Sequence, residues 1–227
     1  MTMFEVTDDW RIAFPSAYAG VLVIRNVSNP PHHPGLENQK SILEDQLRSD
    51  YGGKDRRTLE ILPVLRAYAV YYQRFRKTYH VQLQLESIVT RGKSIPRVAA
   101  LVEAMFMAEV KNLLLTAGHD LDTVQLPVTL DVARGDEKYT LLRGQEQVPK
   151  TGDMLMRDRV GIISSIIYGP DRRTQIRAGT HNVIFTVYAP PGIATEALTN
   201  HLQDIQGYVR LIAPGAHTEM LKVFGAG

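Results

Sequence analysis

The sequence of 227 residues contains no cysteine. This absence excludes disulfides, thiolate zinc sites and cysteine nucleophiles. Long apolar runs are also missing, and none approaches the roughly 18 residues that span a bilayer. Met1 to Trp10 carries acids where a signal peptide would have basic and then apolar residues. We therefore expect a cytoplasmic protein with no membrane partner.

Familiar catalytic motifs are absent as well. The chain has no GxGxxG, P-loop, GxSxG or HExxH pattern, which disfavours the commonest nucleotide-binding proteins, serine hydrolases and metalloproteases. One cluster of histidine and aspartate, without a second histidine at ligand spacing, predicts no tightly bound transition metal. We expect no cofactor.

Neither sign of charge is in large excess. The net charge is +2 and the sequence pI is about 8.8, whereas proteins that hold nucleic acid by its phosphates usually have a larger basic excess. The charge permits an RNA partner without arguing for one. No repeat and no flexible linker divides the chain, so we predict a single domain over residues 1–227.

Apolar periodicity predicts both helices and strands. Helical spacing covers 36–49, 58–77, 96–115 and 195–212. Strands are predicted by alternation over 6–14, 128–133 and 139–143, and by short apolar runs within 18–27, 160–168 and 183–188. Residues 81–85 fit either a strand or an extension of the preceding helix. This mixture predicts an α+β fold, a mostly antiparallel sheet packed with helices. We expect the strands after residue 128 to share one sheet, covered by the 96–115 helix.

The densest chemical cluster is His119, Asp120 and Asp122. An imidazole and carboxylates just after a helix could supply a general base or metal ligands. The alternative is a polar turn with a surface histidine.

A second candidate is the turn from Tyr168 to Thr174. Asp171, Arg172 and Arg173 could offer donors to an anionic ligand such as a phosphate or carboxylate. Alternatively, the arginines are solvated around a Gly-Pro-Asp turn. Basic residues and tyrosines also interleave over 66–79, where packing of the tyrosines on one helix face explains them better than base stacking does.

The order of features over residues 95–192 resembles the B3/B4 editing and tRNA-binding domain of the phenylalanyl-tRNA synthetase beta subunit. A long helix is followed by Asp120-Leu121-Asp122, Leu126-Pro127-Val128-Thr129-Leu130, Leu141-Leu142-Arg143-Gly144, Asp153 to Asp158, Gly161 to Ser165, and Thr180-His181-Asn182-Val183. Residues 1–80 and the helix in 193–213 are additions to this best-matched part.

The resemblance implies a pocket that inspects the aminoacyl group on the 3′ end of tRNA and hydrolyses wrongly attached tyrosine. With this resemblance we expect His119 and Asp120, two to three residues beyond the family's histidine position, as the catalytic pair, Gly161 as a point of close ligand approach, and Thr186 as a specificity donor. Ser164, Tyr168 and Asp171 would complete the ligand site, and Arg172 and Arg173 would hold the tRNA phosphates. The pocket histidine of the family falls at Ala117, and its tyrosine-recognising glutamate falls at Thr186.

Three hypotheses follow. The first is a free-standing protein that deacylates mischarged tRNA in trans. The second is a non-enzymatic module that binds an amino acid or another small ligand on the same fold. The third is a metal-dependent small-molecule enzyme built on His119, Asp120 and Asp122.

Overall fold

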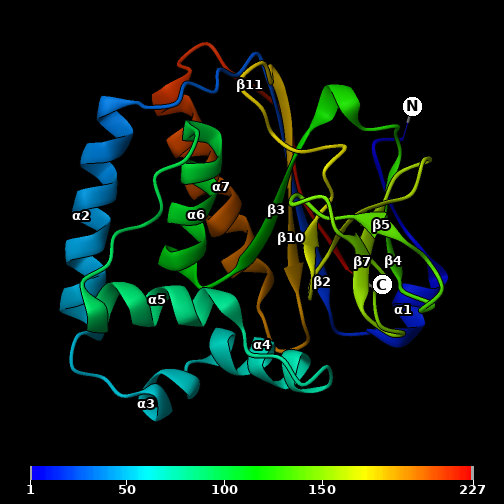
Figure 1. The fold of residues 1–227 in the computed structure, drawn as a ribbon, viewed down its shortest axis with the longest axis horizontal. Coiled ribbons are helices and arrows are strands. Elements are labelled where there is room, and N and C mark those ends of the chain that lie inside the picture. The colour runs from blue at the N-terminus through cyan, green and yellow to red at the C-terminus, as the bar shows by residue number, and fades with distance from the viewer. Residues whose placement is uncertain (1, 226–227) are drawn as a thin grey trace.

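The computed structural model describes residues 2–225. Figure 1 shows a layer of helices, a sheet in the middle, and a second group of strands on the far side of that sheet. No helix in this part of the chain has the length and apolarity needed to cross a bilayer.

The middle sheet has four antiparallel strands in the order β11-β2-β10-β3. The strands are β2 (Tyr18–Arg25), β3 (Leu115–Asp120), β10 (Asn182–Ala189) and β11 (His217–Gly225). The interior of β2 and β10 is almost continuously apolar and buried, as expected for strands covered on both faces. Because β3 pairs only with β10 in this sheet, its other edge is open to different partners.

Helices cover one face of this sheet (Figure 1). They include α6 (Ala100–Asn112) and α7 (Thr195–Ile212), with α2 (Pro34–Tyr51) and α5 (His80–Arg91) packed against α6. The apolar stripe of α7 is buried as its spacing predicts, at Leu198, Leu202, Ile205, Val209 and Ile212.

The second sheet has five strands in the order β1-β4-β7-β8-β9. They are β1 (Phe4–Val6), β4 (Val128–Val132), β7 (Met154–Arg157), β8 (Ile162–Ser165) and β9 (Gly169–Pro170). The β1–β4 pair is parallel and the others are antiparallel. A separate hairpin joins β5 (Tyr139–Thr140) to β6 (Glu146–Gln147). The predicted α+β class with mostly antiparallel strands is confirmed.

The prediction that the later strands share one sheet is wrong. Residues 128–132 and 162–165 lie in the five-stranded sheet, 182–189 in the four-stranded sheet, and 139–140 in the hairpin. Alternation shows that one face of a strand is buried, but it does not show to which sheet the strand belongs.

Several element boundaries also differ from the predictions. Residues 8–13 form helix α1 (Asp8–Ala13) because Thr7 accepts a hydrogen bond from the amide of Trp10 as its N-cap. The predicted helix over 58–77 is divided into α3 (Arg56–Glu60) and α4 (Pro63–Gln73), and residues 81–85 lie inside α5. The predicted 96–115 helix ends at Asn112, where Leu113 takes a left-handed conformation, and β3 follows. A short 3-10 turn over Leu121–Thr123 comes after β3.

Candidate functional site

A cavity of about 230 Å³ opens between the free edge of β3, helix α6 and the β8–β9 segment. Apolar side chains supply most of its wall, including Val102, Met105 and Phe106 of α6 and Ile176 of the loop before β10. A concave, mostly apolar site with a few polar groups is typical of small-ligand sites.

The β3 wall of the cavity includes Ala117 and Gly118. The amide of Thr116 donates to Glu109 Oε1 at 2.8 Å, and the amide of Asp120 donates to the Thr174 carbonyl at 2.8 Å. Because the partners of both amides lie outside β10, both N–H groups point toward the edge of β3 that faces away from β10. Because main-chain directions alternate along a strand, the N–H and C=O of Gly118 point toward the same open edge. Gly118 is partly exposed and lines the cavity, while the space where its side chain would lie is taken by Ile176 and Phe185.

Glu109 is the main ionisable group in the cavity wall. It is almost completely buried on α6, and desolvation raises the pKa of Glu109 to about 8, although the hydrogen bond from the Thr116 amide opposes the shift. The carboxyl group is therefore largely protonated at neutral pH and can donate a hydrogen bond to a ligand.

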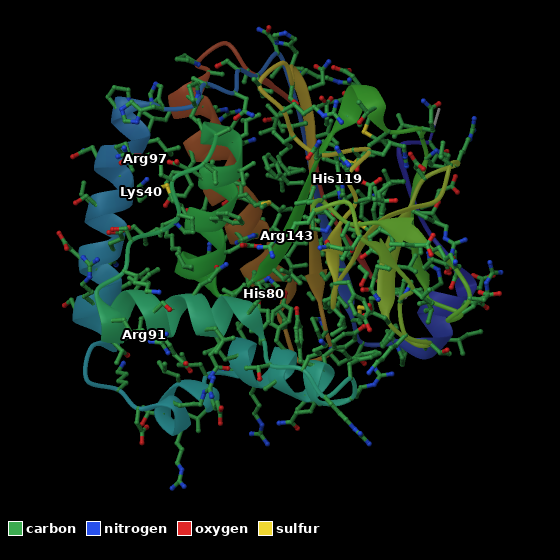
Figure 2. The ribbon with its side chains drawn as sticks, in the orientation of Figure 1. Lys40, His80, Arg91, Arg97, His119 and Arg143 are labelled. Carbon is green, nitrogen blue, oxygen red and sulfur yellow. The ribbon has the colours of Figure 1, made fainter. Side chains whose placement is uncertain are left out.

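His80 is the first residue of α5 and lines the cavity. Part of the residue is exposed to solvent, so it lies at the mouth of the cavity. Figure 2 shows it between the helical layer and the sheets. Its Nδ1 lies 3.3 Å from the hydroxyl of Tyr72. Neither His80 nor Glu109 was among the predicted site residues. A lone glutamate in the apolar run Ala104–Val110 was the available signal for Glu109, because such a helix position is normally buried.

His119 lies in β3 rather than in a turn after a helix, and it is fully buried. Its Nδ1 lies 2.7 Å from the hydroxyl of Thr174, and that hydroxyl donates to Asp171. Nε2 has no hydrogen-bond partner. Desolvation, with the nearby Arg173 charge, lowers the pKa of His119 to about 3. His119 does not line the cavity, and the surface-turn interpretation of this residue is wrong.

Asp120 forms hydrogen bonds that hold neighbouring segments of the chain. One carboxylate oxygen accepts from the amide of Asp122 at 3.1 Å and caps the 3-10 turn, and the other accepts from Thr180 at 2.8 Å. No group of three or more histidine, aspartate or glutamate side chains suited to a metal ion occurs within residues 2–225.

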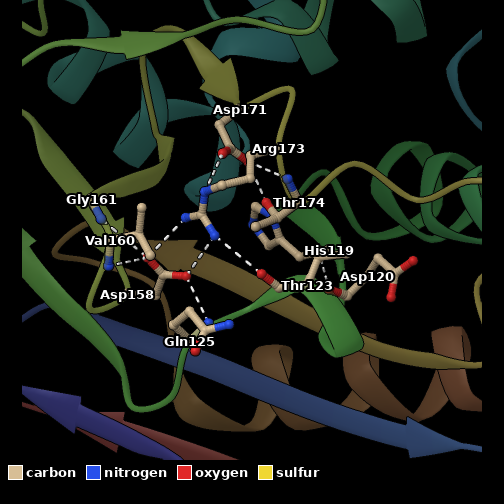
Figure 3. A network of polar contacts seen from close by, with 10 residues as sticks. All are labelled: His119, Asp120, Thr123, Gln125, Asp158, Val160, Gly161, Asp171, Arg173 and Thr174. Carbon is tan, nitrogen blue, oxygen red and sulfur yellow. Dashed lines mark hydrogen bonds and ion pairs between the residues drawn. The ribbon is translucent and has the colours of Figure 1, made fainter.

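Gly161 lies in a separate network, drawn in Figure 3. Asp158 accepts from the amides of Val160 and Gly161 and forms an ion pair with Arg173 at 2.8 Å. A side chain at Gly161 would meet open space, since no atom lies within 4 Å of its Cβ position. Gly161, His119 and Thr186 therefore do not line one cavity.

The remaining predicted ligand residues lie around the cavity rather than in its wall. Ser164 is buried and shares a 2.6 Å hydrogen bond with the hydroxyl of Tyr188, which does line the cavity. Thr186 is buried and donates to the carbonyl of Ala117 at 3.4 Å. Asp171 is buried and accepts from the Thr174 amide at 3.1 Å. Tyr168 is half-buried and lines a surface depression together with Arg143.

The two predicted RNA-binding arginines differ in their surroundings. Arg173 is held by Asp158 and also donates to the Thr123 carbonyl at 3.1 Å (Figure 3). Arg172 is exposed, and its guanidinium lies 3.4 Å from the Cβ position of Gly144, the residue after Arg143. Arg143 and Arg172 thus bring two exposed cations close to Leu142 at the cavity rim.

Comparisons with known proteins agree with the resemblance seen in the sequence. The family model described as the B3/4 domain matches residues 65–206, more than half of the chain. Among solved structures, the chain is similar to an N-terminal fragment of the phenylalanyl-tRNA synthetase beta subunit from Pyrococcus horikoshii, at 13% identity and a TM-score of 0.51. The match covers 96% of this chain and 50% of that one, so this chain spans about half of the fragment's length. A comparison with curated proteins finds no significant match.

Proposed function

Because the chain belongs to the B3/4 domain family, we propose that it binds the aminoacylated 3′ end of tRNA and deacylates mischarged tRNA in trans. The observation that carries this proposal is the cavity at Ala117 and Gly118. Its wall includes Ala117, the position that the resemblance gives to the pocket histidine of the family. Its volume is below the roughly 300–1,000 Å³ of sites for drug-sized ligands, which suits an amino-acid side chain.

The cavity walls offer what an aminoacyl ester needs. The apolar residues of α6 would hold the amino-acid side chain, and the protonated Glu109 carboxyl group would donate to a hydroxyl on it. The outward N–H of Gly118 would donate to the ester carbonyl, whose oxygen gains negative charge when water attacks.

The rim offers cations for the tRNA backbone. Arg143 and Arg172 are exposed beside the cavity, and no ion pair with a carboxylate is found for either within residues 2–225. Arg173 is a weaker candidate for phosphate contact because Asp158 already neutralises it.

A panel of correctly charged and mischarged tRNAs, incubated with the purified protein, tests this function. We expect rapid release of the amino acid from one class of mischarged tRNA. Gly118→Val should abolish that release, because even a Cβ at this position would lie 2.8 Å from Ile176. Gly179→Val is the matched control, since open space surrounds its Cβ position. No release from any charged tRNA would contradict the catalytic function.

The second candidate is a binding module without catalysis. It is favoured by Ala117 and Thr186, which replace the pocket histidine and glutamate that the resemblance implies. Binding of a non-hydrolysable aminoacyl-adenosine analogue, together with no deacylation of any tRNA in the panel, would support this alternative.

A further inference from the structure

A second cavity, of about 380 Å³, adjoins the first along α5. Leu83 and Ile88 of α5 form one wall, and Ile95 and Pro96 of the following loop form another. His80 and Phe106 line both cavities. Figure 2 shows His80 at the beginning of α5. Because its side chain belongs to the walls of both cavities, they meet there.

Hydrogen bonding fixes the tautomer of His80. The hydroxyl of Tyr72 lies 2.7 Å from the carbonyl of Ile166 and 3.3 Å from His80 Nδ1. A carbonyl oxygen can only accept, so the single hydroxyl proton goes to Ile166. The hydroxyl oxygen must then accept from His80, which places the imidazole proton on Nδ1. In the neutral ring, Nε2 is left with a free lone pair.

The surroundings of His80 favour this neutral form. Although the residue is exposed to solvent on one side, the rings of Tyr72 and Tyr79 lie beside the imidazole, and the resulting desolvation lowers the pKa of His80. The ionisable groups that face the ring are Tyr72 and Tyr79, with Glu109 across the first cavity and Lys93 along the second. Burial raises the pKa of both tyrosines well above 10, so neither ionises near neutral pH.

We propose that His80 is the general base that hydrolyses the aminoacyl ester, with the amino-acid side chain in the first cavity and the terminal nucleoside in the second. This proposal rests on the proposed function. The ester joins the two parts of the ligand, so it would lie at the junction, where His80 stands. Apolar walls on α5 and its following loop suit the face of a purine base.

The reaction balances without any further reactant. His80 Nε2 takes a proton from water while the water oxygen attacks the ester carbonyl carbon. The carbon–oxygen bond to the ribose then breaks, and Nε2 returns the proton to the ribose oxygen that leaves. The products are the free amino acid and tRNA with a free hydroxyl group.

His119 makes a useful contrast. Its Nδ1 is held in the same way, by a hydroxyl whose proton goes to another acceptor. Its Nε2, however, is enclosed by protein and does not reach the cavity. Access to the cavity therefore distinguishes the two histidines as candidates for the base.

The test compares His80→Asn with wild type in single-turnover deacylation and in binding of the non-hydrolysable aminoacyl-adenosine analogue. Asparagine can still donate to Tyr72 but has no basic nitrogen. We expect deacylation to slow on the order of 100-fold or more, with the dissociation constant changed less than threefold. His217→Asn, at an exposed position at the start of β11, should keep the wild-type rate.

A pH profile supplies an independent readout. The wild-type rate should rise with pH and level off, with its midpoint below the ordinary histidine value of 6.5, and His80→Asn should lack this step. An unchanged rate in His80→Asn would overturn the role of His80 and leave the proposed function standing. Equal losses of rate and affinity would also overturn it, because His80 would then act in binding alone. Wild-type protein that binds the analogue but deacylates nothing would overturn both catalytic proposals and leave only binding.

Discussion

Glu109 is a carboxyl group whose burial links ligand recognition to stability. Its pKa is raised to about 8 in the folded protein by desolvation, against about 4.5 when exposed. The folded state therefore keeps a proton that the unfolded state has lost between these values. The stability that depends on this proton is fully present below pH 4.5 and declines as pH rises toward 8.

We expect the free energy of unfolding of the wild type to fall between pH 6.5 and 8, by at most about 1.4 kcal/mol per pH unit. Glu109→Gln should remove this slope because glutamine does not ionise. The buried Asp153, His201 and His119 titrate below this range, with pKa values of about 6, about 4 and about 3, and burial raises the pKa of the buried tyrosines above it.

Urea unfolding at several pH values across this range is the measurement. Glu5→Gln is the control, since Glu5 is exposed and should keep the wild-type slope. An equal slope in Glu109→Gln and wild type would show that Glu109 ionises normally in the folded protein.

The sequence predicted residues that lie near the cavity, but it did not predict the residues that form the cavity wall. The sequence placed candidates at His119, Ser164 and Thr186, and all three lie on strands close to the cavity. Whether a strand residue faces a cavity or a packed layer depends on contacts with distant segments. Local patterns do not contain that information, and His80, at the start of a helix, was missed for the same reason. Glu109 was missed although its place in an apolar helical run was a usable signal.

At the scale of elements, the loop between α5 and α6 forms a wall of the second cavity and is held by buried charges. Lys40 of α2 contacts Glu37 at 2.7 Å and Glu103 of α6 at 3.2 Å. Glu103 also accepts from the amide of Val98 at 2.7 Å. These contacts join α2 and α6 to the loop that carries Ile95.

Lys40→Met should therefore destabilise the protein by about 3–5 kcal/mol, because it leaves Glu103 buried without its cation. It should also weaken binding of the aminoacyl-adenosine analogue, because the cavity wall loses its anchor. Denaturant unfolding and calorimetry measure the two effects.

Lys138→Met is the matched control, because Lys138 and Glu146 form an exposed pair whose loss should cost at most about 1 kcal/mol. Equal stability losses in the two variants would show that the Lys40 network does not hold the loop.

Elements with a long apolar period were predictable, and those defined by distant partners were not. The residues of α7 and β2 were anticipated because one continuous face or run specifies each of them. The apolar run through residue 115 predicted one helix, but the chain leaves the helix at Leu113 to pair β3 with β10. Pairing of this kind is a tertiary effect that overrides local propensity.

At the scale of the whole molecule, the fold brings three distant segments to one place. The edge of β3, the beginning of α5 and the β8–β9 segment meet around the first cavity. The family match covers all three segments, and the central sheet holds β3 by pairing on one side only. The ordered motifs of the sequence predicted the family correctly. The apolar alternation, by contrast, assigned to one sheet strands that lie in two sheets and a separate hairpin.

Both proposals require the aminoacyl end of tRNA to occupy the two adjoining cavities. A crystal structure of the protein with a non-hydrolysable aminoacyl-adenosine analogue tests this requirement most directly. We predict the amino-acid side chain against Ala117 and Gly118, the base against the α5 wall, and the ester analogue beside His80. An analogue bound elsewhere on the molecule, or seated with its amino-acid part outside the first cavity, would contradict the account.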